Sequence, residues 1–187
     1  MFNAGIKFSE IFTRDEDAFF INTYLPRNSE VMLSLRMRQI PQLRNTISPN
    51  RVNIDWDQRK WNLPKNGIDQ FYNFARTLIS QYIPAIYLEG YHLLKKQTGT
   101  LFWPKKPKLI WTSTAHITDD VFKAWAAEKI EQGAPLAIGQ HGGNYGVGLW
   151  SFLEEHDLMI SDCYFSWGWS KLGHGNIRPI GILKKVV

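Results

Sequence analysis

The chain has 187 residues, of which 44% are hydrophobic and 21% charged, a globular rather than a disordered composition. Its single cysteine, Cys163, excludes an internal disulfide and a structural zinc site of the usual kind. The excess of 22 Lys and Arg over 17 Asp and Glu gives a net charge of +5, which fits an anionic partner or ordinary surface charge equally well. This length predicts one domain over residues 1–187.

The sequence contains no candidate for a membrane-spanning helix or a signal peptide. No apolar stretch approaches the roughly 20 residues that a span requires. The first residues also lack a basic segment followed by a long apolar run, so we expect a cytoplasmic protein.

Hydrophobic periodicity and Pro or Gly punctuation define the expected elements. In chain order they are a strand at 17–25, a short helix at 30–43, a loop at 45–66, a helix at 71–82 after which Pro84 either kinks the helix or starts a second one running to about 96, a basic connector at 97–107, a strand at 108–113, a helix at 118–133, a strand at 135–140, a helix at 150–155 and a strand at 160–167.

The second half of this series alternates strand and helix. Such alternation predicts an α/β fold, a Rossmann-like parallel sheet with flanking helices. Ligands of these sheets gather outside the carboxyl ends of the strands. Residues 112–116 and 140–143 follow two of the predicted strands, so we expect two histidine-bearing loops at the same edge of the sheet.

The densest chemical pattern is the segment Gln-His-Gly-Gly-Asn-Tyr-Gly at residues 140–146. Glycines beside a histidine let the backbone approach a ligand and direct its amides at anionic oxygens, while imidazole exchanges protons near neutral pH. A glycine-rich turn whose histidine only packs or caps is the structural alternative.

The glycine run matches neither an oxyanion loop nor a nucleotide-binding loop of a known pattern. A lipase-like oxyanion loop needs a Gly-x-Ser-x-Gly elbow elsewhere, and the chain has none. The phosphate-binding patterns GxxxxGK[ST] and GxGxxG are also missing, so neither of those nucleotide-binding devices is supported.

Three weaker candidates have structural roles of equal or greater weight. His116 could orient a substrate or the glycine loop, or cap the helix that starts near Asp119. The acidic residues of 154–157 are interpreted as the solvated end of a helix. Asp162 lies in an apolar strand and needs a hydrogen-bond partner or a cation.

A basic segment of five lysines within residues 95–108 is interleaved with Phe102 and Trp103. This patch could contact phosphate groups of a membrane or nucleic acid, or could simply be a solvated loop. No RNA- or DNA-binding motif accompanies it, so nucleic acid is not the expected partner.

The segments PKLIWTSTAHITDDVFKAWAAEK, IGQHGGNYGVGLWSFLEEHDLMISDCYFSWGWS and IRPIGILK, together with INTYLPRNSE and IPQL, resemble bacterial O-antigen (surface-polysaccharide) transferases. More distantly, the Gln-His-Gly after a strand is similar to capsule Kdo transferases and CDP-glycerol glycerophosphotransferases. The resemblance implies a GT-B glycosyltransferase, of which this chain is similar to the N-terminal, acceptor-side domain.

The resemblance also implies a mechanism and its residues. A sugar would pass from a nucleotide-sugar donor to a glycan or lipid-linked acceptor, without a metal or other cofactor. His141 would be the general base and Gln140 would position it. Substrate contacts would come from the remaining residues of the two loops, Gly142, Gly143, Asn144, His116 and Ser113.

The same resemblance places the donor-binding domain after the end of this chain, so we expect a partial member of the family. We also expect at most a peripheral contact with the cytoplasmic face of the inner membrane. Two alternatives stay open. One is an inactive fragment that binds glycan or a partner protein through its tryptophans. The other is a basic binder of nucleic acid or membrane surfaces, whose binding would depend strongly on salt.

Overall fold

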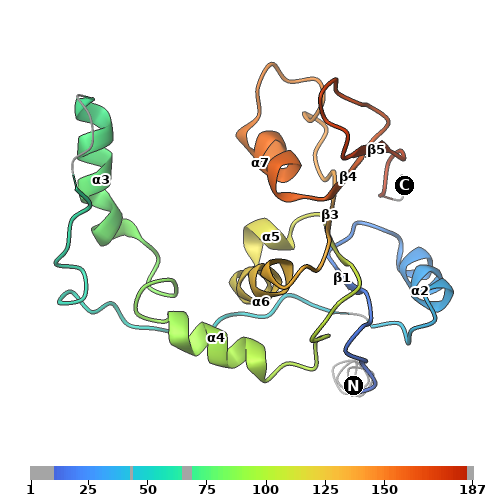
Figure 1. The fold of residues 1–187 in the computed structure, drawn as a ribbon, viewed down its shortest axis with the longest axis horizontal. Coiled ribbons are helices and arrows are strands. Elements are labelled where there is room, and N and C mark those ends of the chain that lie inside the picture. The colour runs from blue at the N-terminus through green and yellow to red at the C-terminus, as the bar shows by residue number, and fades with distance from the viewer. Residues whose placement is uncertain (1–10, 43, 65–68, 185–187) are drawn as a thin grey trace. The chain divides into compact units, whose positions relative to one another are not determined.

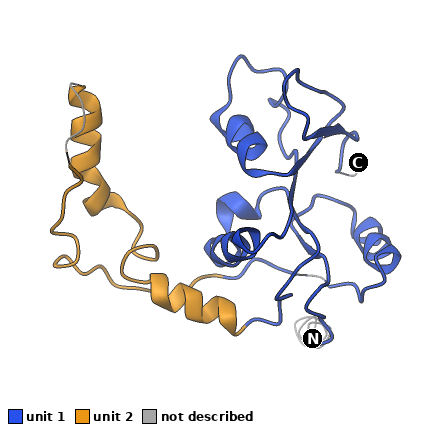
Figure 2. Cartoon of the chain, in the orientation of Figure 1, with its two compact units in different colours: residues 1–47, 101–187 blue, residues 48–100 orange. Residues whose placement is uncertain are grey.

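The computed structural model describes residues 11–42, 44–64 and 69–184. The chain divides into two compact units, one formed by residues 1–47 and 101–187 and the other by residues 48–100 (Figure 2). The prediction that both belong to one domain stays a prediction. No helix in the described ranges is long and apolar enough to cross a membrane.

Figure 1 shows the helices and strands of both units. In chain order they are β1 (Phe19–Ile21), α2 (Arg27–Arg36), α3 (Gln70–Tyr82), α4 (Tyr91–Gly99), β2 (Ile110–Thr112), α5 (Ala115–Thr118), α6 (Asp120–Glu131), β3 (Leu136–Gly139), α7 (Phe152–Ile160), β4 (Cys163–Ser166) and β5 (Ile177–Pro179).

The larger unit is built on a five-stranded sheet in the order β1-β2-β3-β4-β5. Every neighbouring pair is parallel, and Ile21, Thr112, Ile138, Tyr164 and Ile177 lie in register across all five strands. The α/β, Rossmann-like fold is therefore confirmed. Because all strands run in the same direction, the loops that follow them gather at one edge of the sheet.

The two faces of this sheet are covered by different helices, which lie on opposite sides of it in Figure 1. Phe20 and Trp111 belong to a buried cluster against which side chains of α2 pack. On the other face, the ring centroid of Phe19 lies 4.3 Å from that of Trp125 and 5.9 Å from that of Phe122, both on α6. The strand residues are buried on both faces, as expected for a parallel sheet.

The elements differ from the expectation in a few places. The strand β5 and the four-residue helix α5 were not expected. Pro84 neither kinks the helix nor starts the next one, because α3 ends at Tyr82, residues 85–90 form turns and α4 begins only at Tyr91. The helix α7 also starts two residues later than predicted and runs on to Ile160.

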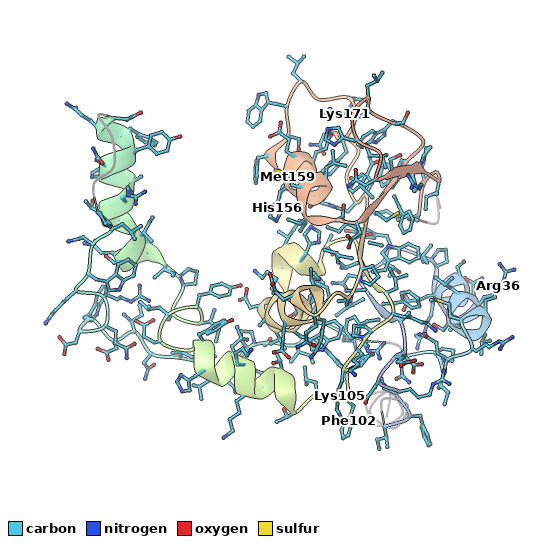
Figure 3. All side chains as sticks on the ribbon, viewed as in Figure 1. Arg36, Phe102, Lys105, His156, Met159 and Lys171 are labelled. Atoms are coloured by element: carbon cyan, nitrogen blue, oxygen red, sulfur yellow. The ribbon has the colours of Figure 1, made fainter. Side chains whose placement is uncertain are left out.

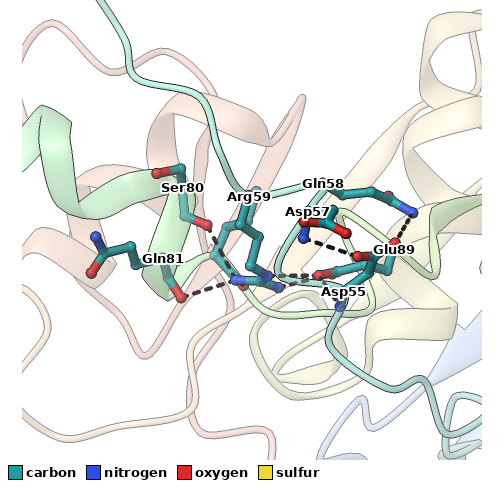
Figure 4. A network of polar contacts seen from close by, with 8 residues as sticks. Asp55, Asp57, Gln58, Arg59, Ser80, Gln81 and Glu89 are labelled. Atoms are coloured by element: carbon teal, nitrogen blue, oxygen red, sulfur yellow. Dashed lines mark hydrogen bonds and ion pairs between the residues drawn. The ribbon is translucent and has the colours of Figure 1, made fainter.

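The smaller unit, residues 48–100, is held by a buried ion pair (Figure 4). Arg59 donates from Nε and Nη2 to the two carboxylate oxygens of Glu89 at 2.6 and 2.8 Å. Its Nη1 donates to the carbonyls of Ser80, Gln81 and Ile83 at 3.3, 2.9 and 3.0 Å. Because the last carbonyls of a helix lack partners within it, Arg59 closes the end of α3.

The same interaction changes the proton affinity of the acid. The hydrogen bonds from Arg59 lower the pKa of Glu89 from 4.5 to about 2, against the opposing effect of burial. The predicted loop at 45–66 thus has a structural role, because its Arg59 links the C-terminal end of α3 to Glu89, two residues before α4 begins.

Candidate active site

Three loops that follow β1, β2 and β3 bring the candidate residues to one edge of the sheet. Ser113 comes directly after β2, His116 lies in α5, and residues 140–144 come directly after β3. Gly143 and Asn144 are exposed, and His141 is partly buried. The prediction that both histidine-bearing loops share one edge follows from the parallel sheet and is confirmed.

His141 lies against the phenol of Tyr145. The atoms His141 Nε2 and Tyr145 Oη are 3.2 Å apart, and the two rings meet edge to face with centroids 5.1 Å apart. Burial raises the pKa of Tyr145, so the phenol keeps its proton. The phenol can donate to Nε2 or accept from it, depending on the tautomer of the ring, and Nδ1 of His141 is buried without a hydrogen bond to any described residue.

The pKa of His141 lies below its ordinary value. Burial is the largest cause, and the nearby charges of His116 and Lys184 lower it further. The carboxylate of Asp157 and the backbone of Ser113 act in the opposite direction. Because the net shift is downward, His141 is neutral at pH 7 and can accept a proton there.

His116 is paired with a carboxylate from a different helix. Its Nε2 lies 2.7 Å from Oδ1 of Asp157 on α7, with the two side chains 6% and 0% exposed. An ionised carboxylate only accepts hydrogen bonds, so the ring donates from Nε2. The expectation that His116 caps the helix near Asp119 is wrong, because Asp119 itself provides that cap through a bond from Phe122 N at 2.8 Å.

Polar atoms around this histidine–carboxylate pair are buried without a hydrogen bond to any described residue. They are Nδ1 of His116, Oδ2 of Asp157 and the hydroxyl of Tyr164. Tyr164 lies on β4, and burial together with the Asp157 charge raises its pKa. Buried polar atoms of native proteins are nearly always bonded, so this group of atoms is a feature that calls for a functional explanation.

Gln140 fixes the glycine loop to the segment after β4. Its amide donates to the carbonyl of Gly142 at 2.7 Å, and its oxygen accepts from Trp167 N and Trp169 Nε1, both at 2.8 Å. The side chain is 1% exposed. Gln140 therefore holds the loop in place through protein hydrogen bonds and is not exposed to a ligand in solvent.

Gly146 ends the loop at a position that only glycine fits. Its φ is +78°, and a Cβ there would lie 2.6 Å from the ring of Trp169. Its amide donates to Glu154 of α7 at 2.7 Å. Gly143, by contrast, has no neighbouring atom within 4 Å of an added Cβ, so its backbone is open to an approaching ligand.

Ser113 is fully buried and holds two loops together. Its hydroxyl donates to the carbonyl of Thr23 at 3.1 Å, and its amide donates to the carbonyl of Asn22 at 2.9 Å. Asn22 and Tyr24 have φ values of +48° and +61°, which are strained for residues other than glycine. These residues also line a polar cavity of about 280 Å³ at the carboxyl end of β1, with Arg27 among its other walls.

Lys184 brings a positive charge to the same edge. Its Nζ lies 4.2 Å from the ring centroid of Tyr24 and 6.0 Å from that of Trp167. It is one of the charges that lower the pKa of His141, so it is close to that ring. Lys184 therefore lies near both the polar cavity beside Tyr24 and the partly buried His141.

Two sequence interpretations are decided by the geometry. Asp162 is exposed and lies just before β4 rather than within the strand, and its carboxylate accepts from Leu136 N at 2.7 Å. The interpretation of 154–157 as a solvated helix end is wrong for Glu154 and Asp157, which are buried, and right for Glu155 and His156, which are exposed. His156 and Met159 are exposed on the side of α7 that faces solvent (Figure 3).

Sequence reasoning assigned no functional role to Asp157, Tyr145, Tyr164 or Lys184. Asp157 could have been found from helical spacing, because Glu154 and Asp157 are three residues apart and share one face of α7 with Leu158. Tyr145 lies in the glycine-rich segment, four residues from His141, whereas Tyr164 and Lys184 carried no such signal. Within the ranges 11–42, 44–64 and 69–184, no three His, Cys, Asp or Glu side chains gather as metal ligands would.

Comparison with known protein families gave a match over residues 3–186, to the model of the LIC12162 family transferases. Neither the curated proteins nor the solved structures gave a match. The family match spans nearly the whole chain, including the sheet, both histidine-bearing loops and the smaller unit, and the chain therefore belongs to the LIC12162 family of transferases.

Proposed function

We propose that this transferase is of the glycosyltransferase type and moves a sugar from a nucleotide-sugar to a glycan or lipid-linked acceptor of a bacterial surface polysaccharide. Membership of a transferase family supports the reaction class. The resemblance of residues 107–184 to O-antigen transferases supports the substrate class.

The observation that carries the proposal is the state of His141. It lies at the carboxyl edge of a parallel sheet, where ligands bind, and its lowered pKa keeps the ring neutral at pH 7. In the proposed step Nε2 takes the proton of an acceptor hydroxyl. The acceptor oxygen bonds to the anomeric carbon, and the bond from that carbon to the nucleotide phosphate oxygen breaks with its electron pair leaving on the phosphate.

Tyr145 and Asp157 assist this base in different ways. If the phenol donates to Nε2, the proton of His141 lies on Nδ1, and the acceptor hydroxyl would replace the phenol at Nε2 when substrate binds. The negative charge of Asp157 raises the pKa of His141 relative to a site without it, so it stabilises the imidazolium that forms as the proton arrives. General bases of this kind contribute about 10²–10⁴-fold to rate.

Gly142, Gly143, Asn144 and Lys184 are the groups proposed to receive the donor phosphates. Glycine-rich turns present backbone amides to anions, and an ammonium group adds charge. Asn144 and Gly143 are exposed, and the Lys184 charge reaches His141. Ser113, His116 and Gln140 are assigned supporting roles, because their side chains are buried and bonded to protein groups.

The test is release of nucleotide from a panel of UDP-, GDP-, dTDP- and CMP-sugars by the purified protein in the presence of a membrane-derived glycan acceptor. We expect release from one donor, and its rate should fall about 10²–10⁴-fold in His141→Gln. Equal rates in His141→Gln and the native protein would exclude His141 as the base. The exposed His156, on the outward side of α7, provides the matched control, His156→Gln.

Glycan binding without transfer is a second candidate, which the exposed apolar side chains after the glycine loop favour. Val147, Leu149, Trp150 and Phe152 are 79%, 104%, 77% and 68% exposed. Aromatic rings of this kind can cover the apolar face of a sugar. Saturable binding of the acceptor glycan with no nucleotide released from any donor would identify this function instead.

A further inference from the structure

Helix α3 of the smaller unit presents its apolar face outward. Its apolar residues recur at the spacing of one helix face, at positions 71, 74, 75, 78 and 82. Phe71, Phe74 and Tyr82 are nevertheless 73%, 61% and 76% exposed. A surface helix normally turns such a face toward the core, so this arrangement is the reverse of the usual one.

The polar side of the same helix is the one bound to the protein. Ser80 is 2% exposed, and the carbonyls of Ser80 and Gln81 accept from the buried Arg59. Arg76, also on the polar side, donates to the carbonyl of Pro64 at 2.9 Å. These bonds fix the rotation of α3 about its axis, so the outward apolar face is built into the unit.

The exposed face has the composition of a helix that lies in a membrane interface. Its large side chains are Phe, Tyr, Leu and Ile, and the phenols of Tyr72 and Tyr82 can reach water or headgroups from an apolar body. An open apolar groove along this face is lined by Ala75, Leu78, Ile79, Tyr82 and Ile83. Residues 48–100 contain seven Lys and Arg against four Asp and Glu; the buried Arg59–Glu89 pair and the Lys60–Asp57 pair are each neutral, so the other residues carry the net charge of +3, which favours an anionic surface.

A second copy of the chain fits this face less well. The exposed parts of its four aromatic side chains and Ile79 amount to about 600 Å², taking roughly 200 Å² for a whole aromatic side chain. A stable protein interface buries about 800 Å² on each partner. A bilayer needs no matching partner surface, so it can cover a single helix face of this size.

We propose that α3 docks this protein on an anionic lipid membrane, lying in the plane of the interface with Phe71, Phe74 and Tyr82 in the acyl boundary. This assignment is distinct from the basic segment before β2, whose Phe102 and Lys105 are labelled in Figure 3. It would place the site of a sugar transfer near a lipid-linked acceptor, but it does not depend on that activity.

The test is co-sedimentation of the full chain with phosphatidylcholine vesicles, with and without phosphatidylglycerol. The native protein should bind the anionic vesicles, and Phe71→Gln with Phe74→Gln should weaken binding at least about tenfold, because two exposed rings no longer leave water. Both side chains are largely exposed, so the helix content seen by circular dichroism should be unchanged.

The matched control is Phe102→Gln with Phe152→Gln, which removes two phenylalanines of similar exposure, 59% and 68%, from the larger unit. It should bind vesicles as the native protein does. The proposal is overturned if the native protein ignores anionic vesicles, if the control loses binding while the α3 variant keeps it, or if the α3 variant instead abolishes a dimer seen by sedimentation velocity without vesicle binding.

Discussion

The carboxylate of Asp157 is the one charge that reaches every titratable ring described at the candidate site. It pairs with His116 at 2.7 Å and raises the pKa of His141, Tyr145 and Tyr164 through its charge. One buried anion therefore favours the protonated forms of His141, Tyr145 and Tyr164. The proton affinities of these side chains are linked through the charge of Asp157.

Replacing Asp157 with Asn removes this charge while keeping the shape of the side chain. The pKa of His141 should fall further, because the effect that raises it is lost, and the titration should be visible in the imidazole NMR resonances. Asp162→Asn, which affects a carboxylate bonded to Leu136 N, should leave the His141 resonances unchanged. An equal shift in both variants would contradict the role given to Asp157.

The variant should also be less stable. Asp157 is fully buried, and the ring of His116 would exchange a carboxylate partner for the neutral amide oxygen of Asn, which still accepts from Nε2. Replacing a hydrogen bond to a charged group with one between neutral groups costs about 1 kcal/mol. Urea unfolding, followed by tryptophan fluorescence, measures this loss.

Gly146 and Gly143 allow a paired test of the loop. Gly146→Ala should destabilise the protein by about 1–2 kcal/mol from the left-handed backbone alone, with a further cost because its Cβ would meet Trp169. Gly143→Ala should fold normally, since nothing lies near its added Cβ. Thermal unfolding of the two variants measures the contrast, and similar melting temperatures would contradict the loop geometry described above.

At the scale of elements, the sequence predicted the strands and most helices because their signals are local. Asp119 caps α6 where a capping residue was expected, and the three-residue core of β1 lies inside the predicted apolar run. Two elements escaped prediction for physical reasons. The four residues of α5 are too few to show a helical period, and β5 (Ile177–Pro179) is exposed at two of its three residues, so it lacks the apolar run that marked the other strands.

The site was predictable only in part, for a similar reason. Residues 140–146 carry their own signal in glycine content and a histidine, so they could be found without the fold. Lys184 could not, because its importance comes from contacts between segments far apart in the chain, and the only signal for Asp157 was its helical spacing from Glu154. The acidic run at 154–157 even favoured the opposite conclusion, since charged residues at a helix end are usually solvated.

The cap of α6 gives a prediction at this scale. Asp119 accepts from Phe122 N at 2.8 Å and, through its other oxygen, from Ile47 N at 3.1 Å. Asp119→Ala should cost about 1–2 kcal/mol, typical of a lost helix cap, in the urea-unfolding free energy. Asp120→Ala, next to it on the more exposed side of the helix start, serves as the control and should cost less.

At the scale of the molecule, the two units should respond to acid in different ranges of pH. The pKa of Glu89 is about 2 when folded against 4.5 when free, so the unfolded chain binds more protons between these values and the stability of the smaller unit is lost as pH falls through them. The lowered pKa of His141 removes stability from the larger unit as pH falls below about 6.5.

Hydrogen exchange at several pH values separates the two effects. Amides of α3 should lose protection between pH 4.5 and 2 in the native protein. In Glu89→Gln they should be less protected at neutral pH and nearly independent of pH in that range. Protection that stays unchanged in this variant would show that the Arg59 ion pair does not hold the smaller unit.

The placement of residues 48–100 between two segments of the larger unit has a consequence for biosynthesis. Phe19 pairs with Ile110, so β1 leaves the ribosome about 90 residues before the strand that completes its ladder, a high contact order for a single pairing. The closure entropy of the intervening segment grows only slowly with length, so the finished fold tolerates it. The nascent chain, however, carries Phe19, Phe20 and Ile21 unpaired for several seconds of translation, and this apolar strand is where chaperones should bind first.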